Sequence, residues 1–352
     1  MSHSASGAAS HQDGEPGSED QPSFSRRLLG GVVVTVLMLT LPAVVGYLVG
    51  GQSISAATGA AEGSLVGLLI AISSGQRRVL LFLPALAIAA LAGYGLYGTW
   101  WWVLACISLA AITGWQARNG LHLPFALTAI LFCVARPNDQ EFNILIFTIA
   151  IVFGALWGLF LSRKIGAPKN IAFDPVENRS ALLYAGVLTL AVSVACLMMM
   201  WLDNPQGYWL PMTVFILAIP KPGVNLAQRA THRLLGTLIG VTLAYLTILI
   251  GSPDLLSLAL ASGLLVVAFV VREPDWLNQA VISAAVVLVM TPIYGSEVGG
   301  SRLLLTGLAA LISVGALVLW TRWSSTDPVV KQNDEDIKKT ITTFADARDS
   351  DD

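Results

Sequence analysis

Charged residues are scarce in this chain. Only 12% of its 352 residues are Asp, Glu, Lys or Arg, whereas 55% are hydrophobic and the mean hydropathy is +0.70. A soluble globular protein carries about 25% charged residues, so this composition excludes that class. The net charge of −2 gives no basic excess for a nucleic-acid partner. We therefore predict a protein whose partner is the lipid bilayer.

Cysteine is rare and the common nucleotide and metal motifs are missing. Cys106, Cys133 and Cys196 lie far apart inside apolar segments, without metal-ligand spacing, and we interpret them as small buried hydrophobic residues. No GxxxxGK[ST] loop is present to bind nucleotide phosphates. We predict no metal, no cofactor and no enzymatic activity.

Long apolar runs occupy most of the chain between two polar ends. Because backbone groups in hydrocarbon must bond within their own segment, we expect an all-α polytopic membrane protein. Twelve candidate spans lie near residues 28–50, 53–74, 79–97, 100–117, 121–135, 142–162, 181–202, 207–220, 232–251, 255–271, 277–292 and 302–323. Residues 1–25 lack the basic start of a signal peptide, so we predict a disordered cytoplasmic tail there and a polar cytoplasmic tail at 324–352.

Basic residues recur at a nearly constant interval. The offsets between corresponding arginines are 153, 152, 154 and 159 residues for the pairs Arg26 and Arg179, Arg77 and Arg229, Arg118 and Arg272, and Arg163 and Arg322. This repetition predicts two parallel six-helix repeats, residues 26–165 and 181–323, joined by a short cytoplasmic linker at 166–180.

The loop charges predict the orientation of the chain. With an even number of spans in each half, 18 of the 20 Lys and Arg residues fall on one side, and only Arg136 and Arg302 fall opposite. Positive loops face the cytoplasm, so both termini are expected there, in a cell (inner) membrane.

Glycines spaced by four residues mark close helix packing. Gly59, Gly63 and Gly67 share one helix face in the first half, as do Gly236 and Gly240 in the second. Small residues at this spacing let two backbones approach each other in a membrane.

The second half also carries a specific motif. The segment Trp209-Leu-Pro-Met-Thr213 is followed by Arg233-Leu-Leu-Gly-Thr237-Leu-Ile-Gly240. Over residues 181–323 this resembles the fusaric acid resistance and aromatic acid exporter family; the first half lacks the motif. The resemblance implies efflux of aromatic or other organic acids, with a small organic anion as the substrate. Many members carry large cytosolic domains, which we do not expect here. A homo-oligomer is compatible with the sequence, and the need for a periplasmic adaptor is left open.

The spacing within this motif predicts a candidate substrate site. On a helix Arg229, Arg233 and Thr237 form one stripe, with His232 beside it. Arginine binds carboxylates through paired hydrogen bonds, although cytoplasmic arginines also follow from the positive-inside rule and from lipid headgroup contact. Trp209 is either part of an aromatic belt at the membrane interface or a surface on which an aromatic substrate stacks.

Glu62 is the one acidic residue near the centre of a predicted span. A charge there costs on the order of 2.5 to 3.5 kcal/mol on insertion scales, so such residues usually face a cavity or a partner. Glu62 is therefore a candidate proton-coupling group; the alternative is a neutral glutamic acid bonded to a neighbouring helix.

Two short spans at equivalent places, 121–135 and 277–292, each end at a proline, Pro137 or Pro292. Paired short helices mark the binding region of several repeat-built transporters. We predict a transporter that exports organic, chiefly aromatic, carboxylates, with proton coupling as a candidate energy source. A passive anion channel, a major-facilitator-type carrier and a non-transporting membrane scaffold remain as alternatives.

Overall fold

A computed structural model of the chain describes residues 33, 36–51, 53–135, 143–165, 175–202, 204, 206–218, 226–250, 260–261, 263–264, 267–268, 274–294 and 297–324. Both predicted tails, most of the predicted linker and most of the predicted span 255–271 lie outside these residues. Every regular element among the described residues is a helix.

The first half contains a short π-helix and six longer helical elements. They are the π-helix Val36–Thr40, α2 (Leu41–Val49), α3 (Ile54–Ser74), α4 (Gln76–Leu96), α5 (Trp100–Trp115) with a 3-10 turn at Gln116–Asn119, α6 (His122–Val134) and α7 (Ile144–Ile165). The second half contains α8 (Asn178–Leu202), α9 (Trp209–Ala218), α10 (Leu226–Leu249), α12 (Asp275–Tyr294) and α13 (Glu297–Ser324).

Five helices among the described residues are long and apolar enough to cross a membrane. They are Ser55–Ser74, Gln76–Leu96, Ile144–Lys164, Asn178–Leu202 and Thr231–Leu249. The protein therefore has multi-pass membrane character, but the predicted count of twelve spans is not confirmed. The reason is helix length: α9 has 10 residues, which is about 15 Å, against a hydrocarbon core of about 30 Å.

The predicted pair of short helices is found only in part. Helix α6 has 13 residues, but α12 has 20 and continues through Pro292 to Tyr294. The prediction that Pro292 ends this helix was wrong, since a proline near a helix end need not stop it when the next residues keep helical geometry. Among the helices described in the second half, the shortest is α9 and not α12.

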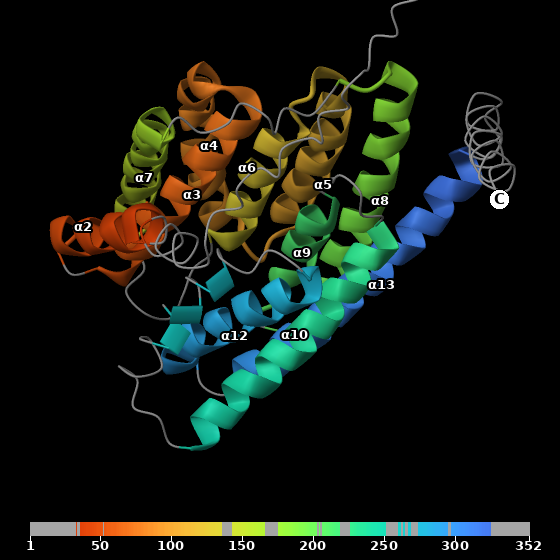
Figure 1. Cartoon of the computed structure of the whole chain (residues 1–352). Coiled ribbons are helices and arrows are strands. Elements are labelled where there is room, and N and C mark those ends of the chain that lie inside the picture. The colour runs from red at the N-terminus through yellow and green to blue at the C-terminus, as the bar shows by residue number, and fades with distance from the viewer. Residues whose placement is uncertain are drawn as a thin grey trace, which may run out of the picture.

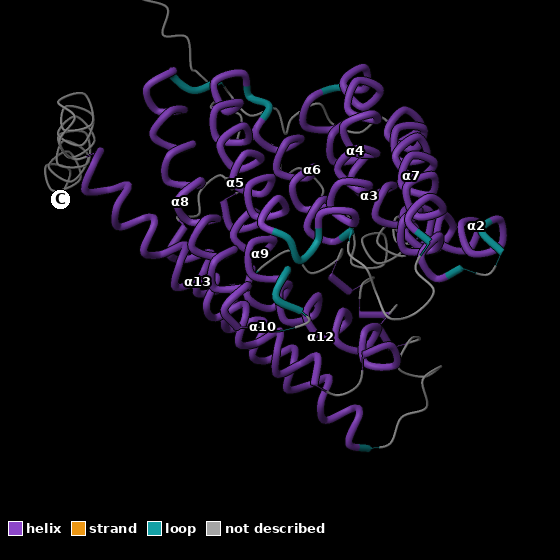
Figure 2. Tube along the Cα trace, turned by 180° about the vertical axis from the view of Figure 1, so that it is seen from behind, coloured by secondary structure: helices purple, strands orange, loops and turns teal. Residues whose placement is uncertain are grey.

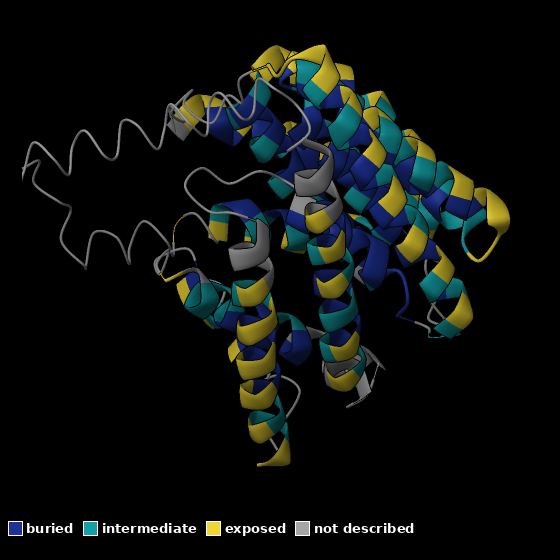
Figure 3. Ribbon diagram, turned by 90° about the vertical axis from the view of Figure 1, so that its right-hand side faces the viewer, coloured by how far each residue is buried: buried dark blue, intermediate teal, exposed yellow. Residues whose placement is uncertain are grey.

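The helices form an upright group and an oblique group. Helices α4 to α8 stand side by side, and α2 lies crosswise at one edge of them (Figure 1). Helices α10 and α13 run together obliquely past the lower ends of this group, as the reverse view also shows (Figure 2). Exposed residues follow stripes along the outer helix faces (Figure 3), which suits faces that contact lipid.

The most extensive helix contact in the first half joins α3 to α7. A Cβ atom added to Gly59 would lie 2.8 Å from the carbonyl oxygen of Phe147, and one added to Gly63 or Gly67 would collide with the next turns of α7. Glycines of α7 meet α3 in the same way, Gly154 at Ala60. The two helices are therefore parallel and in backbone contact.

Helices that the predicted repeat would pair with each other have corresponding neighbours. Helix α4 packs on α6 and α7, and α10 packs on α12 and α13. Likewise α3 packs on α2 and α7, and α9 packs on α8 and α13. The halves are joined where α5 packs on α8 and α6 on α9.

Two hydrogen bonds tie together segments that the sequence places on the cytoplasmic side. Arg163 Nε donates to Gln76 Oε1 at 3.2 Å, joining the end of α7 to the start of α4. The Val176 amide donates to the Ala117 carbonyl at 3.2 Å, joining the segment before α8 to the turn after α5. Within each pair, both segments therefore lie at the same end of the helix bundle.

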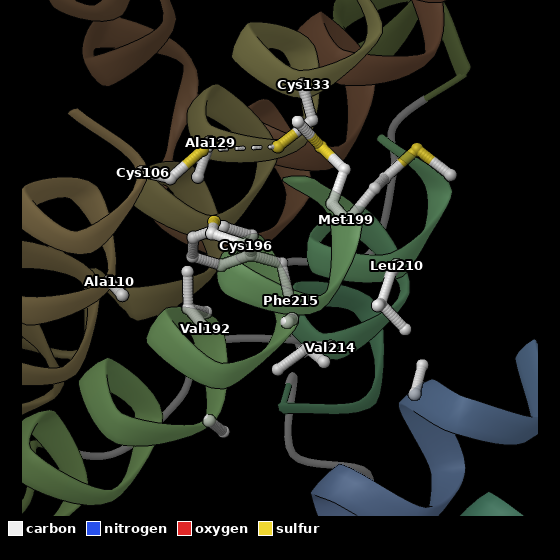
Figure 4. Close-up of a cluster of buried hydrophobic side chains, with 14 of the residues drawn as sticks. Cys106, Ala110, Ala129, Cys133, Val192, Cys196, Met199, Leu210, Val214 and Phe215 are labelled. Atoms are coloured by element: carbon white, nitrogen blue, oxygen red, sulfur yellow. Dashed lines mark hydrogen bonds between the residues drawn. The ribbon is translucent and has the colours of Figure 1, made fainter. Parts of the chain in front are cut away.

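All three cysteines meet in the core between the halves. Cys106 of α5, Cys133 of α6 and Cys196 of α8 are fully buried free thiols, and the Sγ atoms of Cys106 and Cys133 are 3.9 Å apart. Met199 and Phe215 pack into the same cluster (Figure 4). Their burial is as predicted, but their meeting is a long-range contact that spacing in the sequence cannot reveal.

The α3–α7 contact predicts a strong effect of adding bulk at its centre. Gly63→Val should lower the thermal stability of the purified protein in detergent, because the side chain would enter the backbone of α7; overpacking of this kind costs about 1 to 3 kcal/mol. Gly186→Val in α8 is the matched control, since a Cβ there meets no atom within 4 Å. Equal melting temperatures for the two variants would contradict the contact.

Candidate functional site

Helices α10 and α12 run parallel and share polar contacts one turn apart. Arg233 Nη1 donates to Gln279 Oε1 at 3.4 Å. Four residues later in both helices, the hydroxyl oxygens of Thr237 and Ser283 lie 3.3 Å apart. The predicted stripe of Arg233 and Thr237 therefore faces α12.

The glycines of the motif permit this approach. A Cβ on Gly236 would lie 2.6 Å from the Trp276 carbonyl oxygen, and one on Gly240 would collide with the carbonyl oxygen of Ala280. Thr237, between them, is 2% exposed. Its hydroxyl is thus held inside the helix contact and does not line an open mouth.

Arg229 and His232 are the remaining residues of the predicted substrate site on α10. Arg229 belongs to the first turn of α10, and its side chain lies outside the described part of the structure. His232 is half-buried one residue before Arg233.

Arg302 is a residue that the sequence analysis did not choose. It lies near the start of α13 and is 5% exposed. Its guanidinium carbon lies 4.4 Å from the centre of the Trp209 ring. Its Nε and Nη1 atoms are buried and make no hydrogen bond with any residue that the structure describes.

Arg233 and Tyr208 both lie close enough to Arg302 to act on its charge. The cation Arg233 acts unfavourably, and the phenol of Tyr208 acts favourably. The loop-charge argument had assigned these arginines to opposite sides of the membrane. Helix α9, whose first residue Trp209 contacts Arg302, has 10 residues, which is about half the length of a span.

Trp209 sits at the first residue of this half-length helix. Its indole contacts Tyr208, with ring centres 5.5 Å apart, as well as Arg302. Asn204, before α9, donates to Ser301 Oγ at 3.4 Å and so ties this end of α9 to the start of α13. Trp209 thus packs against the buried cation Arg302 at the start of α9.

Glu62 belongs to a different helix pair. It is half-buried in α3, which packs on α7, and it makes no hydrogen bond or ion pair with the described residues. Its neighbours one turn away, Thr58 and Leu65, are also half-buried. Among the described residues, no cluster of three or more His, Cys, Asp or Glu side chains is arranged to hold a metal ion.

A comparison with protein families matches the part of the chain that contains this site. Residues 194–316 match the family described as fusaric acid resistance protein-like. The chain thus carries a fusaric acid resistance protein-like region. The predicted resemblance is confirmed over these residues, and it indicates a transporter-like membrane protein.

One curated relative is similar to part of this chain. The uncharacterized protein YhfK of Escherichia coli (strain K12) is 30% identical over 149 residues, which is 41% of this chain and 21% of that protein. The matched part therefore spans about a fifth of the relative's length. No solved structure matches the chain.

The Thr237–Ser283 contact can be measured as a coupling between α10 and α12. Thr237→Val and Ser283→Ala should each lower stability, and the double variant should lose less than the sum, because one hydrogen bond is counted twice. Hydrogen bonds between membrane helices contribute about 0.6 kcal/mol on average in such cycles. Strictly additive losses in detergent unfolding would show that the hydroxyls do not interact.

Proposed function

We propose that this protein is a membrane transporter that exports organic carboxylic acids, aromatic ones in particular. The observation that carries the proposal is a half-buried cation, Arg233, held in the α10–α12 contact of the fusaric acid resistance protein-like region. Ionisable residues inside membrane helices are costly and commonly mark a substrate or ion pathway. A guanidinium is matched in shape and charge to a carboxylate.

The setting of Arg233 also favours an organic anion. Its hydrogen-bond partner Gln279 is a neutral amide on the facing helix α12. Trp209 and Tyr208 provide aromatic surface in the same region, which suits a substrate with a ring. These features support a carrier of aromatic carboxylates over a scaffold, which would have no use for a charge at this position.

We further infer that the chain is a duplicated unit with both termini in the cytoplasm of a cell (inner) membrane. The equivalent neighbours of α4 and α10, and of α3 and α9, support the duplication. The bonds Gln76–Arg163 and Ala117–Val176 support a common side for the basic segments. For the second repeat to have six helices, residues 255–271 must form a further span.

A passive anion channel would use the same arginines without an energy source. Glu62 favours a coupled carrier, because a carboxyl in a membrane helix without a bonded partner among the described residues can bind and release a proton during a transport cycle. We therefore propose proton-coupled export.

Arg233→Gln should reduce export of a carboxylate by about tenfold or more, because a hydrogen bond to a charged group contributes about 1.5 to 3 kcal/mol. Efflux of labelled benzoate from cells that express the protein measures this, with protein amounts in the membrane compared in parallel. Arg163→Gln is the control, since Arg163 is exposed and bonded to Gln76 at the end of α7. Unchanged efflux in Arg233→Gln would contradict the proposed site.

Glu62→Gln should leave benzoate efflux measurable but remove its dependence on the pH gradient, because an amide cannot carry the proton. Efflux from proteoliposomes with and without an imposed gradient is the measurement. Glu177→Gln, at an exposed position before α8, should keep the dependence. A gradient dependence that survives in Glu62→Gln would rule out coupling at this residue.

A further inference from the structure

Arg302 is the most deeply buried cation among the described residues, and none of its contacts there neutralises it. It is 5% exposed, and two of its three nitrogens are buried without a hydrogen bond to the described residues. Removing a guanidinium from water is costly unless its N–H groups and its charge find partners. None of its described neighbours is a carboxylate: Trp209 offers an indole, Arg233 is a second cation, and Tyr208 is a phenol that acts favourably on the Arg302 charge.

We propose that Arg302 binds the carboxylate of the exported anion directly, with Arg233 as the second positive charge and Trp209 as the surface beside the substrate. This inference rests on the proposed function and names the residue that selects its substrate class. It adds a residue from α13 to the stripe on α10.

The contact with Trp209 fixes the position of the Arg302 guanidinium. With its carbon 4.4 Å from the ring centre, the guanidinium lies over the indole, a contact that restrains it without using its N–H groups. Nε carries one N–H and Nη1 carries two, so three donors remain. A carboxylate presents two oxygens that accept several such bonds.

The second cation explains why the ligand is an anion. The positive charge of Arg233 acts unfavourably on the buried guanidinium of Arg302, so an anion beside Arg302 would be attracted by both cations. An anion bound between them removes both this repulsion and the unmet donors. An amide of the same shape would remove neither fully, and an ammonium compound would be repelled. The site should therefore bind benzoate more tightly than benzamide.

A lipid phosphate shares this chemistry, since it also offers anionic oxygens to arginine. The position of Arg302 favours a free carboxylate: the guanidinium is covered, whereas arginines that serve lipid headgroups reach outward to the interface. The two sources are separated below by changing the lipid and the soluble ligand independently.

The test uses the full chain in phosphatidylcholine nanodiscs, with benzoate as the probe. Benzoate should raise the melting temperature of the wild-type protein and benzamide should not. Arg302→Gln should weaken benzoate binding at least tenfold, while Arg302→Lys, which keeps the charge but loses the planar donor set, should weaken it less. Arg163→Gln, outside the site, should bind as the wild type does.

Three results would overturn the inference. Benzoate could bind Arg302→Gln as tightly as the wild type, benzamide could stabilise the wild type as much as benzoate does, or phosphatidylglycerol alone could give the Arg302-dependent stabilisation. The wild-type comparison of benzoate with benzamide stands even if Arg302→Gln does not fold. Efflux separates the two hypotheses: if Arg302→Gln still exports benzoate, this inference fails and the proposed function stands, whereas a wild type that neither exports nor binds benzoate overturns both.

Discussion

Close approach of helix backbones at glycine is the constraint on which the arrangement of this protein depends. In lipid, two apolar helices gain little by hiding side chains from each other, so their association relies on dense packing and on polar contacts. Gly59 and Gly63 permit the contact of α3 with α7, and Gly236 and Gly240 permit that of α10 with α12. Only because α10 reaches α12 this closely do Arg233 and Thr237 meet Gln279 and Ser283.

The two contacts differ in what they contain. Between α3 and α7 the partners of the glycines are backbone atoms of apolar residues such as Phe147 and Ile151. Between α10 and α12 the same geometry brings polar side chains into register. The first half therefore supplies a firm apolar framework, and the second half combines packing with a charged site.

Features carried by local sequence could be predicted, and features set by long-range contacts could not. Helical membrane character, the glycine faces and the family resemblance of residues 194–316 all follow from composition and short spacing. Hydropathy measures the length of an apolar run but not where a helix ends, so residues 207–220 read as a span although α9 has 10 residues. The meeting of Cys106 with Cys133 and of Arg302 with Trp209 depends on how helices pack.

Arg302 shows why a rule about loops can mislead inside a membrane. The positive-inside rule counts charges near span ends, and under it Arg302 was one of two exceptions on the wrong side. The structure gives the exception a physical meaning: the residue is not a loop charge but a buried one, beside a half-length helix whose first residue is Trp209. Broken or short helices leave polar groups at membrane depth, where they are tolerated only if they are buried in protein or line a cavity. Burying an unmatched cation destabilises a fold, and this cost is the physical ground for the proposal that Arg302 binds a ligand with a negative charge.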